Sequence, residues 1–482
     1  MPAVARHVVI IGGGITGLTA AYALNESARR HASAGPRLSC TLVEASPRLG
    51  GKILTDRADG FVIEGGADSF LAQKPWGIDL CRRLGLTDSL MTTNPEHRKT
   101  FVLLQGRLQE LPEGVVMGVP GKLGPFLRTR LLSWPAKLRI AAEFFIPRNR
   151  HTEDESLAAF FRRRLGQEAL DRMIEPLLSG IYTADADQLS LLATFPRFRE
   201  MELAHGSLLR AMLLAKWRER RAEETSAAAT AFVTLREGLG HLVQTLAGRL
   251  EGTTVLMNSP VLELRRQGEH GYEILMTDRS LSADAVILAT PAYDAAGLLA
   301  PVDRALSDDL TGIPYAGSVT VSLGFRKHEL RHDLDGYGFV VPRAENRLAM
   351  ASTWTSSKWD HRAPDNAVLL RCYLGGDGRE AVLKRTDGEI VELAQVELRA
   401  ILGIDQTPVL ARVYRWPLAM PQYRVGHLCR LAAIGARLEH VPGVFLAGAG
   451  YRGVGIPDCI RDGMAAAENV GRYFDKVMPT FV

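Results

Sequence analysis

The sequence predicts an α/β fold built around a doubly wound, mostly parallel sheet, and three observations predict it. A β-branched run at Val8–Ile11 leads directly into a glycine-rich turn and then into an alanine-rich helical segment. A second apolar strand is expected at Leu38–Val43, and a third, Val444–Leu446, enters another glycine turn far along the chain. Apolar strands that alternate with helical segments are typical of a parallel sheet.

Size and composition fit a large globular enzyme. With 482 residues, 46% hydrophobic and 23% charged, the chain is expected to form two or three domains. The net charge of +4 and the lack of a Lys/Arg run argue against nucleic acid as a partner. The five cysteines include no CxxC pair, which argues against a disulfide framework and against a metal site, and favours a reducing cytoplasm. No apolar stretch is long enough to predict a transmembrane segment.

The first glycine turn has the pattern of a dinucleotide-binding site. It consists of Gly12, Gly13, Gly14, Ile15, Thr16 and Gly17. In the GxGxxG pattern, the first glycine permits the turn, the second lets the backbone approach a pyrophosphate, and the third lets helix and strand pack closely. The helix N-terminus then presents free N–H groups to the phosphates. The pattern alone also occurs in purely structural turns.

The segment after the second strand strengthens this prediction. Glu44 ends the strand, where a carboxylate can accept hydrogen bonds from ribose hydroxyls. Its spacing from the glycines is longer than usual, which we attribute to an insertion around Arg29–Pro36. A cation and a glycine pair suited to a diphosphate follow, within the run Ala45, Arg48, Gly50, Gly51 and Lys52.

With these residues the sequence resembles the FAD-dependent amine oxidase and protoporphyrinogen oxidase superfamily, in which an Arg-x-Gly-Gly segment follows the ribose carboxylate. The resemblance implies FAD, held without a covalent bond because no cysteine stands in the C-terminal glycine turn. It also implies further cofactor-binding residues: Gly66, Ala67, Asp68 and Ser69 beside the isoalloxazine, Val261 at the adenine, Trp416 near the ring, and Gly448, Val454, Gly455 and Ile456 along the ribityl chain. A helix is expected from about Ile460. For Trp416 a core aromatic is the alternative.

A narrower resemblance, to the water-soluble bacterial branch of protoporphyrinogen and coproporphyrinogen III oxidases, covers nearly the whole chain. It is carried by residues 160–166, 175–182, 189–190, 194–196, 420–423 and 455–458. It implies oxidation of coproporphyrinogen III to coproporphyrin III in haem biosynthesis, by hydride transfer from the macrocycle to flavin, with oxygen as acceptor and hydrogen peroxide as product. Protoporphyrinogen IX is the alternative substrate.

The same resemblance implies residues that contact the substrate. Ile181 would border the porphyrin, Lys74 would lie near its propionates, and Tyr373 would lie across the pocket. A solvated surface lysine is the alternative for Lys74. No catalytic side chain is expected, because the flavin performs the chemistry. Two other interpretations stay open: an amine or carotenoid-type oxidoreductase of the same fold, and an FAD-holding partner that delivers porphyrin without turnover.

The implied domain organisation is discontinuous. Residues 1–80, 235–300 and 436–482 would form the FAD-binding domain, 81–115 and 301–435 a mixed-sheet substrate domain, and 116–234 a helical insert. Residues 121–150 form an amphipathic basic stretch. It could contact an anionic membrane or a partner enzyme such as the next one of the haem pathway, could attract a tetra-anionic porphyrinogen electrostatically, or could be an ordinary solvated helix. Residues 222–230 are expected to be a flexible loop. The protein is expected in the cytoplasm, with peripheral contact at the inner face of the membrane left open.

Overall fold

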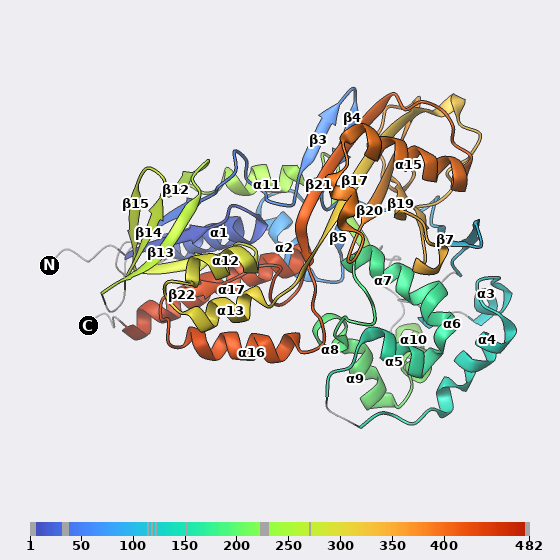
Figure 1. Cartoon of the computed structure of the whole chain (residues 1–482), viewed down its shortest axis with the longest axis horizontal. Helices are drawn as coiled ribbons and strands as arrows, with labels where there is room; N and C mark the ends of the chain where they lie inside the picture. Colours follow the sequence, from blue (N-terminus) through green and yellow to red (C-terminus); the bar gives the residue numbers. More distant parts are fainter. Residues whose placement is uncertain are drawn as a thin grey trace.

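The computed structural model describes residues 6–30, 38–112, 115–116, 119–120, 123–150, 153–221, 231–268 and 271–477. Figure 1 shows a parallel sheet with its helices on one side of the molecule, a second, mixed sheet on the other side, and a group of helices beneath that second sheet. The predicted loop 222–230 lies outside the described residues, as does most of the predicted insertion around Arg29–Pro36.

The first sheet is parallel throughout and is assembled from distant segments. Its strands, in spatial order, are β12 (Thr253–Leu256), β2 (Leu38–Val43), β1 (Arg6–Ile11), β16 (Ala285–Leu288) and β22 (Val444–Leu446). Val8 pairs with Cys40 on one side and with Ala285 on the other. β1 is buried on both faces, which explains its continuous apolar run. The predicted doubly wound α/β fold is confirmed.

Helices cover both faces of this sheet. One face carries α1 (Ile15–Arg30), α2 (Pro75–Arg83), α11 (Gly240–Ala247) and α17 (Ile456–Val477). The other carries α12 (Ala292–Leu299), α13 (Arg304–Thr311), α16 (His427–Leu438) and the antiparallel meander β13 (Val261–Gln267), β14 (Gly271–Met276) and β15 (Ser280–Ala283). The prediction of a helix from about Ile460 was wrong, since α17 begins at Ile456. Pro457 stands in its first turn, where no N–H is needed.

The second sheet is mixed. Its strands, in spatial order, are β21 (Leu410–Pro421), β17 (Tyr315–Arg326), β20 (Ala367–Gly375), β19 (Ala349–Trp354), β18 (Gly338–Val340), β7 (Thr100–Leu104) and β8 (Arg107–Glu110). β18 pairs with β7 in parallel and the other pairs are antiparallel. The amphipathic helix α15 (Asp387–Leu402) packs its apolar side on this sheet.

Five short strands lie outside the two sheets, and one short helix joins β19 to β20 within the second sheet. They are β3 (Thr55–Ala58), β4 (Phe61–Glu64), β5 (Phe70–Leu71), β6 (Leu90–Thr92), β11 (Phe232–Leu235) and α14 (Thr355–Lys358). β3 pairs with β4, and β11 lies between β5 and β6. The turn between β4 and β5 is therefore placed at the junction of the two sheets.

The insert consists mainly of helices. They are α3 (Leu123–Arg128), α4 (Trp134–Ala141), η2 (Ala142–Phe145), α5 (Leu157–Leu165), α6 (Gln167–Ala169), η3 (Leu170–Ile174), α7 (Glu175–Tyr182), α8 (Leu191–Thr194), α9 (Pro196–His205) and α10 (Leu208–Arg221), preceded by the strand pair β9 (Val115–Val116) and β10 (Val119–Pro120). In the described part of the chain, no helix is both long and apolar enough to span a membrane.

The basic stretch 121–150 is broken rather than one continuous helix. Ser133 caps α4 by accepting a hydrogen bond from the backbone N–H of Ala136, so a new helix starts there. Lys137, expected on a solvated face, is 6% exposed and donates to the carbonyls of Leu127 and Thr129. One cation of the stretch is thus used internally, to close the end of α3.

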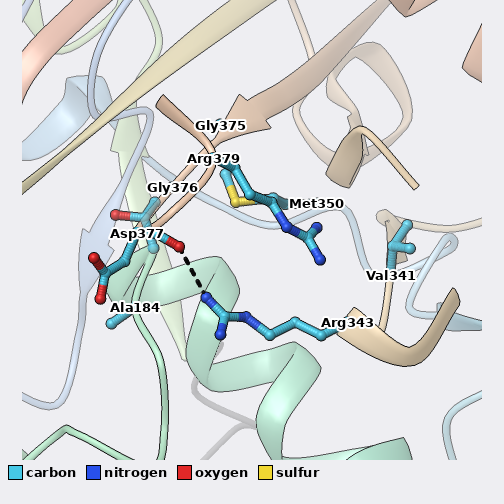
Figure 2. Close-up of a pocket in the computed structure, with 9 residues that line it drawn as sticks. Ala184, Val341, Arg343, Met350, Gly375, Gly376, Asp377 and Arg379 are labelled. Atoms are coloured by element: carbon cyan, nitrogen blue, oxygen red, sulfur yellow. Dashed lines mark hydrogen bonds between the residues drawn. The ribbon is translucent and has the colours of Figure 1, made fainter. Parts of the chain in front are cut away.

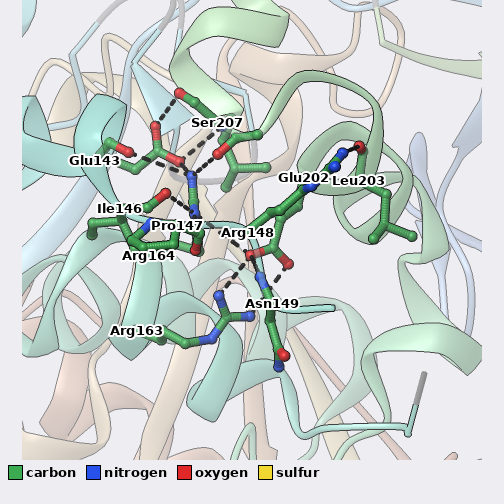
Figure 3. A network of polar contacts seen from close by, with 12 residues as sticks. Glu143, Ile146, Pro147, Arg148, Asn149, Arg163, Arg164, Glu202, Leu203 and Ser207 are labelled. Carbon is green, nitrogen blue, oxygen red and sulfur yellow. Dashed lines mark hydrogen bonds and ion pairs between the residues drawn. The ribbon is translucent and has the colours of Figure 1, made fainter. Parts of the chain in front are cut away.

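A buried ion network holds the insert together (Figure 3). Arg164 pairs with Glu143 and lies 3.5 Å from Glu202, and all three side chains are fully buried. Arg163 donates to the same Glu202 at 2.6 Å, and Ser207 donates to Glu143 at 2.5 Å. Because an unpaired buried charge is costly, these groups depend on one another.

Candidate active site

The first glycine turn lies at the carboxyl end of β1, and two of its glycines cannot carry a side chain. Gly12 has a φ of +108°, and a Cβ there would lie 2.7 Å from the Ala289 carbonyl oxygen. A Cβ on Gly17 would lie 1.9 Å from the Gly12 carbonyl oxygen. Around Gly14 the nearest atom to such a Cβ is 4.0 Å away, so space stays open beside the turn. Backbone approach by a ligand is therefore allowed at Gly14.

Glu44 is fixed beside this turn by backbone hydrogen bonds. Its Oε2 accepts from the N–H of Gly13 at 2.6 Å and its Oε1 from the N–H of Ser46 at 2.8 Å. The Ser259 N–H donates to the Glu44 carbonyl at 2.9 Å, which brings the turn before Val261 to the same place. The predicted ribose and adenine residues thus lie at one edge of the parallel sheet.

Arg48 braces the loop that follows Glu44. Its guanidinium donates to the carbonyls of Gly51 at 2.6 Å and Ile53 at 3.1 Å. The Gly50 N–H donates to the Gly13 carbonyl at 2.8 Å, so this loop lies directly on the first glycine turn. Arg48 therefore shapes the backbone around the predicted diphosphate position, a role that its charge alone does not reveal.

Lys52 stands at the end of the loop that Arg48 braces. Its Nζ donates to the Ala419 carbonyl, and its side chain is accessible to solvent. Burial nevertheless lowers the pKa of Lys52, partly offset by the nearby carboxylate of Asp294. The Lys52 ammonium is therefore an accessible cation that a bound ligand can contact. Burial raises the pKa of Cys459 to about 11, so this thiol is neutral.

The turn at Gly65 and Gly66 is clamped by side chains from the second sheet. The Gly65 carbonyl accepts from the indole N–H of Trp416 at 2.8 Å and from Arg371 at 3.2 Å. Arg371 also donates to the Gly66 carbonyl, and Thr320 donates to Gly65 at 2.7 Å. A Cβ on Gly66 would lie 1.8 Å from a carbonyl oxygen of the neighbouring loop. Trp416 thus orients this turn and is more than a core aromatic.

Asp68 continues this turn and is held ionised. Burial acts to raise the pKa of Asp68, but Lys358 and Arg371 outweigh it, and the pKa lies below its usual range. Lys358 Nζ is 3.6 Å from Asp68, and the Ser69 hydroxyl donates to Asp68 at 2.7 Å. The neighbouring Ala67 packs against the core beneath the parallel sheet. Sequence reasoning missed Lys358 and Arg371.

The C-terminal glycine turn is anchored from two sides. Gly448, with a φ of +125°, donates its N–H to Asp462 at 2.7 Å. The Tyr423 hydroxyl donates to the Ala449 carbonyl at 2.5 Å and accepts from the Gly453 N–H at 2.8 Å. The segment that follows β21 and the helix α17 itself therefore fix the turn from which α17 starts.

Backbone donors gather at the start of α17. Throughout the described ranges, no protein acceptor is found for the backbone N–H groups of Val454, Gly455 and Ile456. Such donors, together with the positive end of the helix dipole, stabilise negative charge nearby. Their arrangement suits the predicted contact with a flavin.

The predicted substrate residues lie on three different elements. Tyr373 lies on β20, with the Arg371 guanidinium 4.8 Å from its ring centroid. Lys74 precedes α2 and pairs with the buried carboxylate of Asp458 at 2.5 Å, so its charge is already matched. Ile181 belongs to α7. Contact of these residues with a porphyrin remains a prediction.

These residues fit FAD. The glycine turn, Glu44 and the Arg48 loop could hold the adenosine and diphosphate, while the Gly65–Gly66 turn and the donors at 454–456 could hold the flavin ring. In the described C-terminal turn, residues 448–456 contain no cysteine, which is consistent with a non-covalent cofactor.

The parallel sheet with a glycine turn and an acceptor carboxylate at its edge defines a dinucleotide-binding protein. A family model described as flavin containing amine oxidoreductase matches residues 15–471. The chain belongs to this family and is an FAD-dependent oxidoreductase, as the sequence predicted.

Individual relatives are similar over nearly their whole length. The chain is 39% identical to coproporphyrinogen III oxidase of Bacillus subtilis, over 97% of this chain and 98% of the relative. It is 36% identical to coproporphyrinogen III oxidase of Propionibacterium freudenreichii, with 96% and 90% covered. The solved structure of a putative protoporphyrinogen oxidase from Exiguobacterium is 33% identical, with a TM-score of 0.84 and 96% and 98% covered.

Proposed function

We propose that this protein oxidises coproporphyrinogen III to coproporphyrin III in haem biosynthesis. The observation that carries the proposal is the similarity to two coproporphyrinogen III oxidases over nearly the full length of each chain. That similarity includes the helical insert and the second sheet, which a dinucleotide-binding fold alone does not require.

The reaction removes hydride and proton pairs from the macrocycle in successive two-electron steps. Bound FAD would supply the two-electron acceptor. We propose oxygen as the final acceptor, reduced to hydrogen peroxide once for each two-electron step. No side chain is needed as a strong base, because solvent can take the pyrrole protons.

The residues of the chain orient the reactants. Arg371 and Trp416 fix the Gly65–Gly66 turn, so that one wall of the site is preorganised before substrate binds. The free N–H groups at 454–456 and the Lys52 ammonium would stabilise negative charge that develops on the cofactor side. Catalysis is thus proposed to come from placement and electrostatics.

Protoporphyrinogen IX is the second candidate substrate. It is favoured by the similarity to the Exiguobacterium protein, which is titled a putative protoporphyrinogen oxidase. The two substrates differ in the number of propionate groups, so cationic groups around the site would distinguish them.

The test is anaerobic mixing of the purified yellow holoenzyme with each porphyrinogen. Flavin absorbance is followed first, and porphyrin fluorescence and peroxide are measured after oxygen is admitted. Rapid bleaching by coproporphyrinogen III, with slow bleaching by protoporphyrinogen IX, is expected. If neither porphyrinogen bleaches the flavin, the proposal fails, and amines and carotenoid precursors become the next substrates to test.

We further propose that the enzyme is cytoplasmic and that its insert contacts an anionic membrane surface. Trp134 and Leu138, one turn apart on α4, are 64% and 69% exposed, and Phe145 is 88% exposed. The cations Arg128 and Arg148 are also exposed on the insert. Exposed aromatic and apolar side chains beside cations suit the interface of an anionic membrane.

Vesicle sedimentation tests this contact. The holoenzyme is expected to bind vesicles rich in phosphatidylglycerol and not those of phosphatidylcholine alone. Trp134→Ser with Phe145→Ser should abolish binding, whereas Leu262→Ser, at a 62% exposed position on β13, should not. Absence of binding would instead favour the next haem-pathway enzyme as the partner of this face.

A further inference from the structure

A small pocket lies where α7 of the insert meets the end of β20 (Figure 2). Its walls include the residue after α7, Thr183, the turn after β20, and the side chains of Met350, Arg343 and Arg379. The space is about 270 Å³ including its mouth. Most of this space is its open mouth, and the enclosed part has room for about one water molecule, so the end of a side arm can enter and a macrocycle cannot.

The pocket adjoins both predicted substrate positions. Thr183 follows Ile181 by two residues, and Gly375 follows Tyr373 by two residues on the same face of β20. The Asp377 N–H donates to the Thr183 carbonyl at 2.9 Å, which fastens the two segments together. A substrate between Ile181 and Tyr373 would therefore have this pocket at one end.

Two arginines enter the pocket, and they differ in their partners. Arg343 donates to the Asp377 carbonyl at 3.0 Å and lies 3.4 Å from Asp185. Arg379 donates to the Arg347 carbonyl at 3.2 Å. Over the described part of the chain, no carboxylate lies within ion-pair distance of Arg379. The positive charge of Arg379 is thus not balanced by an ion pair with a carboxylate of the described chain.

A second acid, Glu175, lies beside Arg343, and burial weakens its acidity. Glu175, at the start of α7, lies 3.7 Å from the Arg343 guanidinium. Burial raises the pKa of Glu175 to about 7, although Arg343 and Arg379 oppose this. Glu175 is therefore partly protonated near neutral pH, so Asp185 and Glu175 together do not neutralise both arginines, and Arg379 can attract another carboxylate.

We propose that Arg343 and Arg379 form a carboxylate subsite that receives one propionate of the porphyrinogen. The inference rests on the proposed function and deepens it, because it names a determinant of substrate choice. A planar guanidinium binds a carboxylate through paired hydrogen bonds, and a propionate arm fits a narrow space. The subsite favours coproporphyrinogen III, because this substrate carries a propionate on every pyrrole ring and can present one to the subsite in any orientation of the macrocycle.

Kinetics of the Arg379→Leu holoenzyme test this subsite. The KM for coproporphyrinogen III should rise about 10- to 100-fold, as expected for loss of a charge-assisted hydrogen bond, while kcat and the flavin spectrum stay close to wild type. Arg379→Lys should recover part of the loss. Arg304→Leu, at a position 79% exposed on α13, removes the same charge elsewhere and should change nothing.

Product binding gives a second readout that needs no turnover. Wild-type holoenzyme should bind coproporphyrin III more tightly than its uncharged tetramethyl ester, and Arg379→Leu should lose most of that preference. If Arg379→Leu cannot hold FAD, Arg379→Gln carries the same measurement. If the wild-type enzyme oxidises coproporphyrinogen III and Arg379→Leu has the same KM and the same product affinity, the subsite proposal is wrong. If no porphyrinogen reduces the flavin of the wild-type enzyme, the proposed function is wrong instead.

Discussion

Glu44 is preorganised for the ribose before any cofactor arrives. The N–H groups of Gly13 and Ser46 hold its carboxylate, and charge-assisted hydrogen bonds of this kind are strong. Glu44→Gln keeps the size and removes the charge, so affinity for FAD should fall about 10- to 100-fold. Titration of apoprotein with FAD measures this. Glu251→Gln, at a 77% exposed side chain, should leave the affinity unchanged, and equal affinities for both variants would contradict the role of Glu44.

Glu64 makes stability depend on pH. Burial raises its pKa to about 7, although Arg362 and hydrogen bonds from Leu239 and Thr55 oppose this. Its contribution is fully present below the ordinary glutamate pKa of 4.5 and is lost as the pH rises through 7. The free energy of unfolding should therefore fall, over this range, by about 3 kcal/mol more in wild type than in Glu64→Gln. Denaturant titrations at several pH values would show parallel curves if this is wrong.

Sequence reasoning found the residues whose signal is local. Gly12 and Glu44 follow apolar strands at fixed spacings, because one turn and one strand end create their geometry. Arg371 contacts the Gly65–Gly66 turn from 306 residues away, and Lys358 contacts the following Asp68. Both contacts depend on how distant segments of the chain pack. One signal was present, since Arg371 is the charged residue within the apolar strand β20.

At the level of elements, the helical insert depends on its buried ions. Arg164→Leu would leave Glu143 unpaired in the core, which typically costs about 3 to 5 kcal/mol. Arg162, two positions earlier, is 43% exposed and pairs with Asp187, so Arg162→Leu should cost about 1 kcal/mol or less. Hydrogen exchange across α5 and α9 measures both. Equal protection in the two variants would contradict the prediction.

The packing of α1 against α17 gives a second matched pair. A Cβ on Gly463 would lie 2.4 Å from the Thr16 carbonyl oxygen, whereas a Cβ on Gly471 meets no atom within 4 Å. Gly463→Ala should push the helices apart and weaken FAD binding. Gly471→Ala should stabilise α17 by about 0.5 to 1 kcal/mol, because alanine loses less entropy in a helix. Thermal unfolding of the holoenzymes compares them, and destabilisation by Gly471→Ala would be the contrary result.

At the level of the whole molecule, FAD should protect segments that are far apart in sequence. The predicted contacts come from residues 12–17, 44–52, 65–69 and 448–456, which the parallel sheet and its neighbours bring together. Hydrogen exchange with and without FAD should show slower exchange in all of these segments and little change in α9. Protection confined to the N-terminal segments would contradict the assembled site.

The sequence could suggest some strands of the parallel sheet, but it could not determine their order. Glycine turns indicated that β1 and β22 belong to the parallel sheet, since each turn marks a carboxyl end, and Glu44 indicated β2. The pairing of β16 between β1 and β22 depends on contacts across nearly the whole chain. Likewise, the break of the basic stretch at Ser133 reflects a cap and the burial of Lys137, which an amphipathic pattern does not reveal.

The same strand order determines when each strand of the parallel sheet can pair with its neighbours during synthesis on the ribosome. β1 can pair with β2 early, but its other edge waits for β16, and β16 in turn waits for β22. At typical elongation rates, the chain from Ile11 to Val444 takes roughly 20 to 90 seconds to emerge. Throughout that interval an apolar parallel edge has no permanent neighbour, which exposes the nascent chain to aggregation. Expression at a lower temperature, or with additional chaperones, should therefore raise the yield of active protein. The gain should be larger than that from substitutions that stabilise the folded protein.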